Sequence, residues 1–574
     1  MNRREFVQFL IAGYAAGIVR PSYGSSSVDY NFKPFGNLRL IHITDTHAQL
    51  DPMHFREPNF NLGVGANKNI PPHIVGEKFL DYYSIDTALL KHAYTHLDFS
   101  KHAKQYGKFG GYAHLKTLID LLKSQVNNNS LLLDGGDTWQ GSGLSYLEKG
   151  RDMVEASNLL GVDVMTGHWE FTYGEKTFLN NLNNFNGNFV AQNISLTEEA
   201  IFEGLEPKDD DNHFQEPYVI KTINGSRIAI IGQAFPYTPI ANPKRFMPNL
   251  TFGIRDSELQ VLVNNIKEKE KPSVIILLSH NGVDVDKKMA SKVNGIDIIF
   301  GGHTHDVLPK PIVVKNLNNS TLVLNSGCNG KFVSVLDLDV KKSSFSYRYK
   351  LLPVLSNQIK ASKEMNSFIT EIKKPHIMHL NEVIGKSNQD LYRRGNFNGS
   401  FDNLICDSMT NVLDSEISLS PGFRWGPTVL ASDDIKMSDI YNHTAITYPN
   451  VYRRELTGET IKNILEDVAD NIFNPDPYLQ QGGDMVRTTG LSYEITPKNS
   501  INNRLSNIRT NDGKLLNNNK KYVVSGWASV NTEESGRPIW DVTKEYLSNI
   551  KYYDLSEVKQ PKVLHENDNF GLET

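Results

Sequence analysis

The stretch Leu38-Arg39-Leu40-Ile41-His42-Ile43-Thr44-Asp45-Thr46-His47 joins a strand pattern to two candidate metal ligands. Its first part, residues 38–44, alternates between apolar and polar side chains, which predicts a β-strand. The strand ends in a carboxylate and an imidazole that are separated by one threonine. Because Asp-x-His pairs occur by chance in many chains, this motif taken alone favours an ordinary loop.

Four more apolar runs end in the same kinds of residue. They cover residues 130–133, 162–165, 274–278 and 296–300, and lead into Asp134-Gly135-Gly136-Asp137, Gly167-His168-Trp169-Glu170, Ser279-His280-Asn281-Gly282 and Gly301-Gly302-His303-Thr304-His305. Open α/β sheets carry their sites at the carboxyl ends of their strands. Each histidine alone is better explained as a hydrogen-bonded loop or core residue, but the coincidence of five strand ends indicates one shared site.

The order of the predicted elements indicates two domains of different class. A chain of 574 residues exceeds the size at which a single core stops growing. Helical periodicity at residues 115–126, 153–160 and 259–267 lies between the predicted strands, so residues 36–354 should form a layered α/β domain. We expect a helical connector at 355–376 and a second, α+β domain at 377–567.

Composition excludes several classes of function. The formal net charge of -5 provides no basic footprint for nucleic acid, so we expect no nucleic-acid partner. With Cys328 and Cys406 as the two cysteines, the sequence offers neither a disulfide framework nor a thiolate zinc site. Any metal must therefore be held by carboxylates and by some of the 17 histidines.

The N-terminal residues 1–27 have the pattern of a targeting segment. Arg3 and Arg4 precede a moderately apolar run at 9–19 and a serine-rich break at 25–27, which resembles a twin-arginine export signal. The alternative is a cytosolic amphipathic first helix. We expect export to the periplasm, and no membrane-spanning segment in the mature form.

The ordered motifs resemble those of the calcineurin-like metallophosphoesterases (D-x-H, G-D, G-N-H-E, H, G-H-x-H), and more narrowly those of the 5′-nucleotidase family. The resemblance implies a layered αββα metallophosphoesterase-like domain followed by a smaller α+β 5′-nucleotidase-type C-terminal domain that binds substrate. It also implies two divalent ions that share a bridging carboxylate. By position, one ion would be held by Asp45, His47 and His305, the other by His168, His280 and His303, and Asp137 would bridge them.

One departure from the nucleotidase pattern narrows the resemblance. Where that family has Gly-Asn-His-Glu, this chain has Gly167-His168-Trp169-Glu170, so an indole replaces the catalytic histidine. The same change, and long runs such as 134–142, 165–172, 420–426 and 480–487, resemble the SoxB thiosulfohydrolase family.

The narrower resemblance implies a substrate and a partner. It implies release of sulfate from a cysteine-bound S-thiosulfonate on the SoxYZ carrier protein, by a hydroxide that two metal ions activate. The ligand set is compatible with Mn²⁺, and with Zn²⁺ as the other option. The alternatives are a periplasmic 5′-nucleotidase or related phosphoesterase, and a non-catalytic metal-binding partner of the carrier.

Three further residues are candidates for catalytic roles. Arg424 and Arg487 lie in glycine-containing loops of the second domain, and a guanidinium fork can bind a sulfonate or phosphate through paired charge-assisted hydrogen bonds. An ordinary interdomain salt bridge explains either arginine as well. Trp169 could pack against the sulfur end of a substrate arm, or it could simply fill the core below the site. Trp425 and Tyr478 are candidates for the walls of the cleft.

Overall fold

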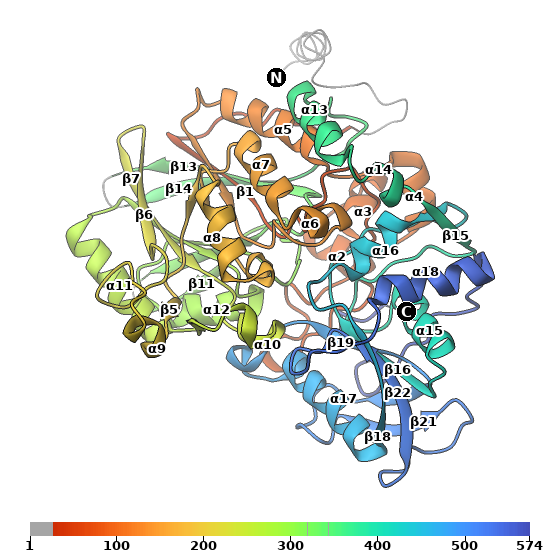
Figure 1. Cartoon of the computed structure of the whole chain (residues 1–574). Helices are drawn as coiled ribbons and strands as arrows, with labels where there is room; N and C mark the ends of the chain where they lie inside the picture. The colour runs from red at the N-terminus through yellow and green to blue at the C-terminus, as the bar shows by residue number, and fades with distance from the viewer. Residues whose placement is uncertain (1–26, 318, 342–343, 574) are drawn as a thin grey trace.

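The computed structural model describes residues 27–317, 319–341 and 344–573, and its N-terminal half contains two six-stranded sheets (Figure 1). The first sheet has the order β14-β13-β1-β2-β3-β4 and the second β11-β12-β10-β9-β7-β6. The strands of the first are β1 (Leu38–Ile43), β2 (Ser130–Asp134), β3 (Val164–Met165), β4 (Asn188–Phe189), β13 (Phe332–Val340) and β14 (Phe345–Pro353). Those of the second are β6 (Tyr218–Ile223), β7 (Ser226–Gln233), β9 (Val274–Ser279), β10 (Ile298–Gly301), β11 (Ile312–Lys315) and β12 (Ser320–Asn325).

The alternating direction of side chains along the strands divides the apolar core into layers. In β1, Leu38 and Leu40 contribute to an apolar layer between the two sheets, which also contains Ile276 and Phe300 of the second sheet. Ile41, the next residue in β1, belongs instead to the cluster on the opposite face of the first sheet. Because successive side chains of a strand point to opposite faces, every central strand is buried on both sides.

Helices cover the outer faces and complete an αββα arrangement. On the first sheet lie α5 (Tyr112–Ser124) and α7 (Arg151–Leu160), and on the second lie α11 (Asp256–Lys269) and α12 (Val283–Lys292). The predicted helices overlap α5, α7 and α11, and the five predicted strands overlap β1, β2, β3, β9 and β10. The layered α/β prediction for the first half is therefore confirmed.

The second half is α+β, as predicted. Its central sheet has the order β18-β22-β16-β19, packed against the helices α15 (Ser400–Val412) and α17 (Gly458–Phe473). The strands of this sheet are β16 (Ile417–Gly422), β18 (Val451–Thr457), β19 (Asp484–Thr489) and β22 (Lys521–Trp527). The helix α13 (Lys363–Lys373) lies within the expected connector at 355–376, and the short helix α14 (Ile377–Leu380) follows directly after it. The exact domain limits stay predictions.

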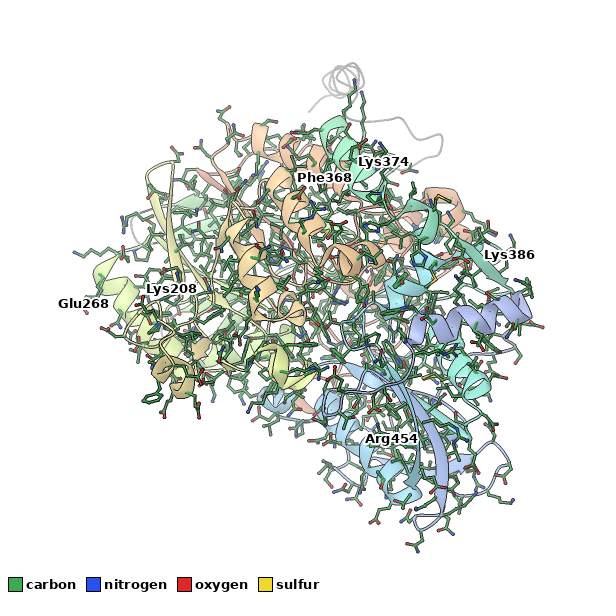
Figure 2. All side chains as sticks on the ribbon, in the orientation of Figure 1. Lys208, Glu268, Phe368, Lys374, Lys386 and Arg454 are labelled. Carbon is green, nitrogen blue, oxygen red and sulfur yellow. The ribbon has the colours of Figure 1, made fainter. Side chains whose placement is uncertain are left out.

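The two halves are tied together by chain segments that cross between them. Phe60 and Leu62 from the first half lie in the apolar core of the second. The backbone N–H of Asn61 donates a 2.8 Å hydrogen bond to the carbonyl of Gly571, near the C-terminus. Charged side chains such as Glu268 and Lys386 lie at the periphery of the molecule (Figure 2). In the part of the chain that is described, we find no helix with the length and hydropathy needed to span a bilayer.

Candidate dinuclear metal site

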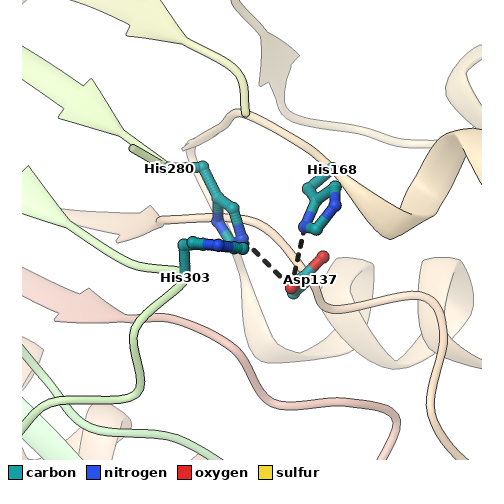
Figure 3. Close-up of side chains that lie close together, drawn as sticks. All are labelled: Asp137, His168, His280 and His303. Carbon is teal, nitrogen blue, oxygen red and sulfur yellow. Dashed lines mark hydrogen bonds and ion pairs between the residues drawn. The ribbon is translucent and has the colours of Figure 1, made fainter. Parts of the chain in front are cut away.

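The strand ends bring all seven predicted metal ligands together in two adjoining groups. Asp137 belongs to both, and within each group the candidate ligand atoms lie within 4.8 Å of one another. One group is Asp137, His168, His280 and His303, and the other is Asp45, His47, Asp137 and His305. In Figure 3, His168 and His280 are directed toward the Asp137 carboxylate, with His303 beside them. The partition matches the one that the family resemblance implied.

The Asp137 carboxylate lies at the centre of both groups. Its Oδ2 atom is 3.0 Å from His280 Nε2, 3.3 Å from His168 Nδ1 and 3.6 Å from His47 Nε2. In the second group, the Nε2 atoms of His47 and His305 are only 3.0 Å apart. Nitrogen and oxygen lone pairs that converge in this way are arranged as for a cation, and one shared carboxylate suits two ions.

The backbone at the site is held in an uncommon conformation. Five of the seven ligand residues have positive φ values: Asp45 (50°), His47 (44°), Asp137 (57°), His303 (73°) and His305 (58°). A non-glycine residue in the left-handed region costs on the order of 1 kcal/mol, and such residues cluster at functional sites. The surrounding sheet ends therefore hold these side chains in place against a local preference for other conformations.

Hydrogen bonds behind the ligands fix their orientation. The buried Glu170 carboxylate accepts 2.7 Å bonds from the backbone N–H groups of Thr138 and His168. His280 Nδ1 lies 2.6 Å from the carbonyl of Gly135, which leaves Nε2 facing Asp137. Partners of this kind set the tautomer and the direction of a metal-binding imidazole.

The charge states of His303, His305 and Asp137 suit metal binding. At His280, burial opposes a charge, but Asp137 and Asp45 outweigh burial and raise the pKa to about 10, so a metal ion must displace a proton there. Burial lowers the pKa of His303 and of His305 well below the ordinary value, so both imidazoles are neutral at pH 7 and can donate a lone pair. Burial alone would raise the pKa of Asp137, but His168 and His280 hold it well below its usual range. His303 Nε2 is buried and has no hydrogen-bond partner among the described residues. These residues can bind two divalent metal ions.

A cavity of about 340 Å³ opens beside the two groups and is lined by residues from both halves of the molecule. His47, Asp137 and His303 reach its surface from the first half, and Trp169 lines it next to His168. Arg424 lines it from the second half. The structure thus brings two of the three predicted catalytic residues to the metal groups. Trp425 also lines the cavity, as expected, whereas Tyr478 does not.

Arg424 is anchored by three contacts that leave part of its guanidinium free. Nη2 donates a 2.7 Å hydrogen bond to the carbonyl of Gly483, and Nη1 donates a 3.4 Å bond to the carbonyl of His303. Nε lies 3.5 Å from Oδ1 of Asp484. Since a guanidinium has five N–H groups, one on each terminal nitrogen stays available for a ligand in the cavity.

The structure corrects the expectation for Arg487. This side chain is fully buried and does not line the cavity. Its Nη2 lies 3.2 Å from Asp484 Oδ2, and its Nε lies 3.4 Å from Asp402 Oδ2. The glycine-containing loop ends at Gly483, and β19 then carries Arg487 into the interior. Arg487 is therefore an internal partner of Asp484 and makes no contact with a molecule in the cavity.

Several residues at the cavity were not predicted from the sequence. Phe235 lies with its ring stacked on His303 at a centroid distance of 3.9 Å, and Phe423 stacks on Trp425 at 4.3 Å. Asp484 lines the cavity as well. Phe235 follows the end of β7 (Ser226–Gln233) by two residues, but the strand-end rule selects Asp and His as metal ligands and therefore gives no signal for a phenylalanine.

Comparison with known proteins agrees with this architecture. The family model of the calcineurin-like phosphoesterases matches residues 38–307, and that of the 5′-nucleotidase C-terminal domain matches residues 383–539. The trifunctional nucleotide phosphoesterase protein YfkN of Bacillus subtilis is 25% identical over 72% of this chain, and rat 5′-nucleotidase is 28% identical over 53%. These alignments span only 30% and 54% of those two proteins.

Two solved structures resemble the whole chain. The sulfate thiohydrolase SoxB of Thermus thermophilus is 30% identical, with a TM-score of 0.86 over 94% of this chain and 98% of that one. A 5′-nucleotidase precursor from the same organism has 21% identity and a TM-score of 0.71 over 92% of this chain, which shows a shared fold. The chain therefore belongs to the 5′-nucleotidase and calcineurin-like metallophosphoesterase superfamily.

Proposed function

We propose that this protein is a hydrolase that releases sulfate from a cysteine-bound S-thiosulfonate on a carrier protein of the SoxYZ type. The similarity to the Thermus sulfate thiohydrolase supports the proposal. The observation that carries it lies in the cavity: the described residues that line it offer Arg424 to an oxyanion, but no side chain suited to protonate a leaving group.

The titratable side chains that line the cavity decide whether a leaving group can be protonated there. Apart from the metal-group residues, those among the described residues are Arg424, Tyr448 and Asp484. Burial opposes ionisation of Asp484, but Arg424 and Arg487 hold its pKa below the usual value, so it is a carboxylate at pH 7. The Tyr448 hydroxyl donates to the carbonyl of Ala241, and burial raises its pKa. None of these groups is an acid of the strength that ester cleavage requires.

A thiosulfonate does not need such an acid. In the proposed reaction, a water oxygen bonds to the terminal sulfonate sulfur while the sulfur–sulfur bond breaks, which yields sulfate, a persulfide on the carrier cysteine and protons. A persulfide is a weakly basic anion and leaves without protonation, whereas an alkoxide benefits from a general acid. Two divalent ions, when bound, would supply Lewis acidity for the water and charge for the sulfonate oxygens.

The residues of the chain would bind and orient the substrate. The free N–H groups of Arg424 can donate to two sulfonate oxygens, in the paired geometry that suits planar guanidinium groups. Trp169 and Phe423 pack edge to face at 5.6 Å and form an apolar wall. Such a wall suits the sulfur chain of the substrate and excludes water around it.

The rival reading, a periplasmic 5′-nucleotidase or related phosphoesterase, is supported by the nucleotidase relatives. It requires an aromatic face on which a base can stack. Trp425 is stacked with Phe423 at 4.3 Å and with His47 at 5.2 Å, so protein rings already stack on it. The Phe235 ring is stacked on His303. These contacts favour a substrate without a base.

The proposal also specifies the cellular compartment of the protein and the metal ions of its site. A sulfur-carrier substrate suits the periplasm, and the expected twin-arginine signal, which lies outside the described residues, would deliver a folded protein there. The nitrogen and oxygen ligands suit Mn²⁺, with Zn²⁺ as the other option.

One assay separates the candidate functions. Metal-loaded protein is incubated in parallel with S-thiosulfonated SoxYZ-type carrier and with AMP, and sulfate and phosphate are measured. We expect sulfate release that requires the carrier and negligible phosphate. Phosphate without sulfate would establish the nucleotidase alternative, and neither product would indicate a non-catalytic metal-binding partner of the carrier.

A further inference from the structure

A chain of alternating charges runs from the cavity into the interior of the second half. It begins at Arg424 and continues through Asp484 and Arg487 to Asp402, whose Oδ1 accepts a 2.7 Å hydrogen bond from Arg393 Nε. The side chains behind Arg424 are fully buried, whereas that of Arg424 is 13% exposed. Asp484 also lines the cavity, but Arg424 is the one member of this chain of charges with a partly exposed side chain.

Asp484 joins Arg424 to this interior chain. Its Oδ1 faces Arg424 Nε at 3.5 Å and the side-chain amide of Asn396 at 3.4 Å, and its Oδ2 faces Arg487 Nη2 at 3.2 Å. Both carboxylate oxygens are therefore engaged. A carboxylate held from behind in this way cannot rotate freely, so it fixes the group in front of it.

The backbone brings Asp484 and Arg424 together by a close approach of two strands. Gly422 of β16 pairs with Asp484 of β19 at an irregularity in the register. A Cβ atom on Gly422 would lie 2.3 Å from the carbonyl oxygen of Asp484, so this pairing requires glycine. Arg424 follows Gly422 by two residues and is delivered beside the carboxylate.

We propose that Asp484 is the positioning residue for Arg424: it holds Nε so that the free N–H groups on the two terminal nitrogens point toward an oxyanion bound in the cavity. Arg487 keeps Asp484 ionised and in place. The inference rests on the proposed role of Arg424 in binding the sulfonate.

A different role for Asp484 predicts the opposite change in anion affinity, so the two roles can be distinguished by experiment. If Asp484 were only a negative charge near the site, its removal would strengthen the binding of an anion by removing repulsion. If it positions Arg424, its removal weakens anion binding, because the guanidinium loses its fixed direction and a charge-assisted bond to the ligand.

The test is a calorimetric titration of inorganic sulfate into metal-loaded full-length protein. We expect Asp484→Asn to weaken sulfate binding about tenfold or more, the effect of one lost charge-assisted hydrogen bond. Unchanged or tighter binding by this variant would overturn the proposal. Arg424→Ala serves as a separate arm: if it binds sulfate as the wild type does, the role of Arg424 in the proposed function fails, whatever Asp484 does.

One further variant separates positioning from folding. Asp484→Asn leaves Arg487 with one carboxylate partner fewer, so its melting temperature should fall. The double variant Asp484→Asn with Arg487→Met removes one charge of each sign and should recover part of that loss, yet still bind sulfate weakly. Recovery of sulfate affinity together with stability would contradict positioning.

A matched control lies in the first half of the molecule. Asp337 forms a fully buried pair with Arg39, with 2.6 Å between Oδ1 and Nε, and neither residue lines the cavity. Asp337→Asn should lower the melting temperature and leave sulfate affinity unchanged. A loss of sulfate affinity in this control equal to that in Asp484→Asn would show that general destabilisation causes the effect, which would refute the proposal.

Discussion

The backbone N–H of Trp169 donates a 2.8 Å hydrogen bond to Oδ1 of Asp137, the carboxylate shared by both metal groups. The residue that departs from the nucleotidase pattern therefore supports the bridging carboxylate through its main chain. Its side chain can change without loss of that bond. This explains how the position can carry an indole while the ligand geometry around Asp137 is kept.

We predict two divalent metal ions per folded chain, and a large loss of metal from Asp137→Asn. The reason is that the Asp137 carboxylate lies within reach of both ligand groups, and an amide binds divalent ions more weakly than a carboxylate. Elemental analysis of protein purified without chelators measures the content.

The matched control for this prediction is a surface group of similar composition. Asp209, Asp211 and His213 could also bring ligand atoms together, but this group is partly exposed. Asp209→Asn should leave the metal content unchanged. Equal metal content in wild type and Asp137→Asn would contradict the assignment of the bridging ligand.

We predict that Arg424→Ala lowers carrier-dependent sulfate release by about tenfold or more, because a charge-assisted contact with the sulfonate is lost. Some stability should also be lost, since the side chain is largely buried and bonds the carbonyl of Gly483. Asp484 keeps Arg487 as a partner, so the fold should survive. Melting curves and kinetics measured together test this, and normal kinetics with a large drop in melting temperature would mean that Arg424 is structural.

The metal groups could be predicted because each ligand lies within a few residues of a strand end. Strand periodicity is a local property of the sequence, and parallel strands such as β1 and β2 end at the same edge of a sheet. The seven ligands were therefore placed together without knowledge of the loops between them. The sequence carries no comparable local signal for the left-handed backbone conformation at residues such as Asp45.

The roles of Arg424 and Arg487 could not be separated in the same way. Both follow glycines, but their burial depends on which distant strands pair. In the structure Arg487 faces Ser420 across the β16 and β19 pairing and is enclosed by the second half, whereas Arg424 lies beyond the end of β16. Tertiary pairing of this kind is not encoded in either short segment.

We predict that lowering the pH destabilises the protein through buried neutral histidines. Burial lowers the pKa of His92 to about 3, against about 6.5 in an unfolded chain. Above about pH 6.5 the imidazole is neutral in both states and makes no difference; between about 6.5 and 3 the unfolded chain takes up a proton that the folded chain refuses. Stability is therefore lost progressively across that window.

The variant His92→Gln isolates this contribution. Its melting temperature should fall less than that of the wild type between about pH 7 and about pH 5, because the residue no longer titrates. The exposed His565 provides the control, and His565→Gln should show the wild-type dependence. Identical pH dependence of His92→Gln and wild type would disprove the assignment.

We predict that Arg3→Lys combined with Arg4→Lys leaves the protein in the cytoplasm as an unprocessed precursor, because the twin-arginine route reads the arginine pair itself. Cell fractionation with a mass measurement of the product tests this. Replacement of Lys33 and Lys78, which lie outside the expected signal, provides a control that should be exported normally. Undiminished periplasmic protein from the Arg3 and Arg4 variant would exclude this route.

The last prediction concerns the chemistry that Trp169 selects. The wild type should hydrolyse simple alkyl phosphates negligibly, because no described side chain at the cavity can protonate an alkoxide. Trp169→His should raise this hydrolysis to a measurable rate, since a general acid contributes about 100-fold or more. It should also lower the melting temperature, because the indole is 95% buried and packs against Phe423 and Trp425.

Trp169→Phe separates acid catalysis from the effect of added space. Phenylalanine is also smaller than tryptophan and keeps an apolar edge toward Phe423, but it cannot donate a proton. We therefore expect Trp169→Phe to lose stability, to retain most carrier-dependent sulfate release, and to gain no ester hydrolysis. A gain of ester hydrolysis in Trp169→Phe equal to that in Trp169→His would mean that space beside His168, and not the missing acid, limits the wild type. Rapid metal-dependent AMP turnover by the wild type would contradict the proposal more directly, because it would require a proton donor that we do not find among the described residues of the cavity. The nucleotidase function would then replace the one proposed.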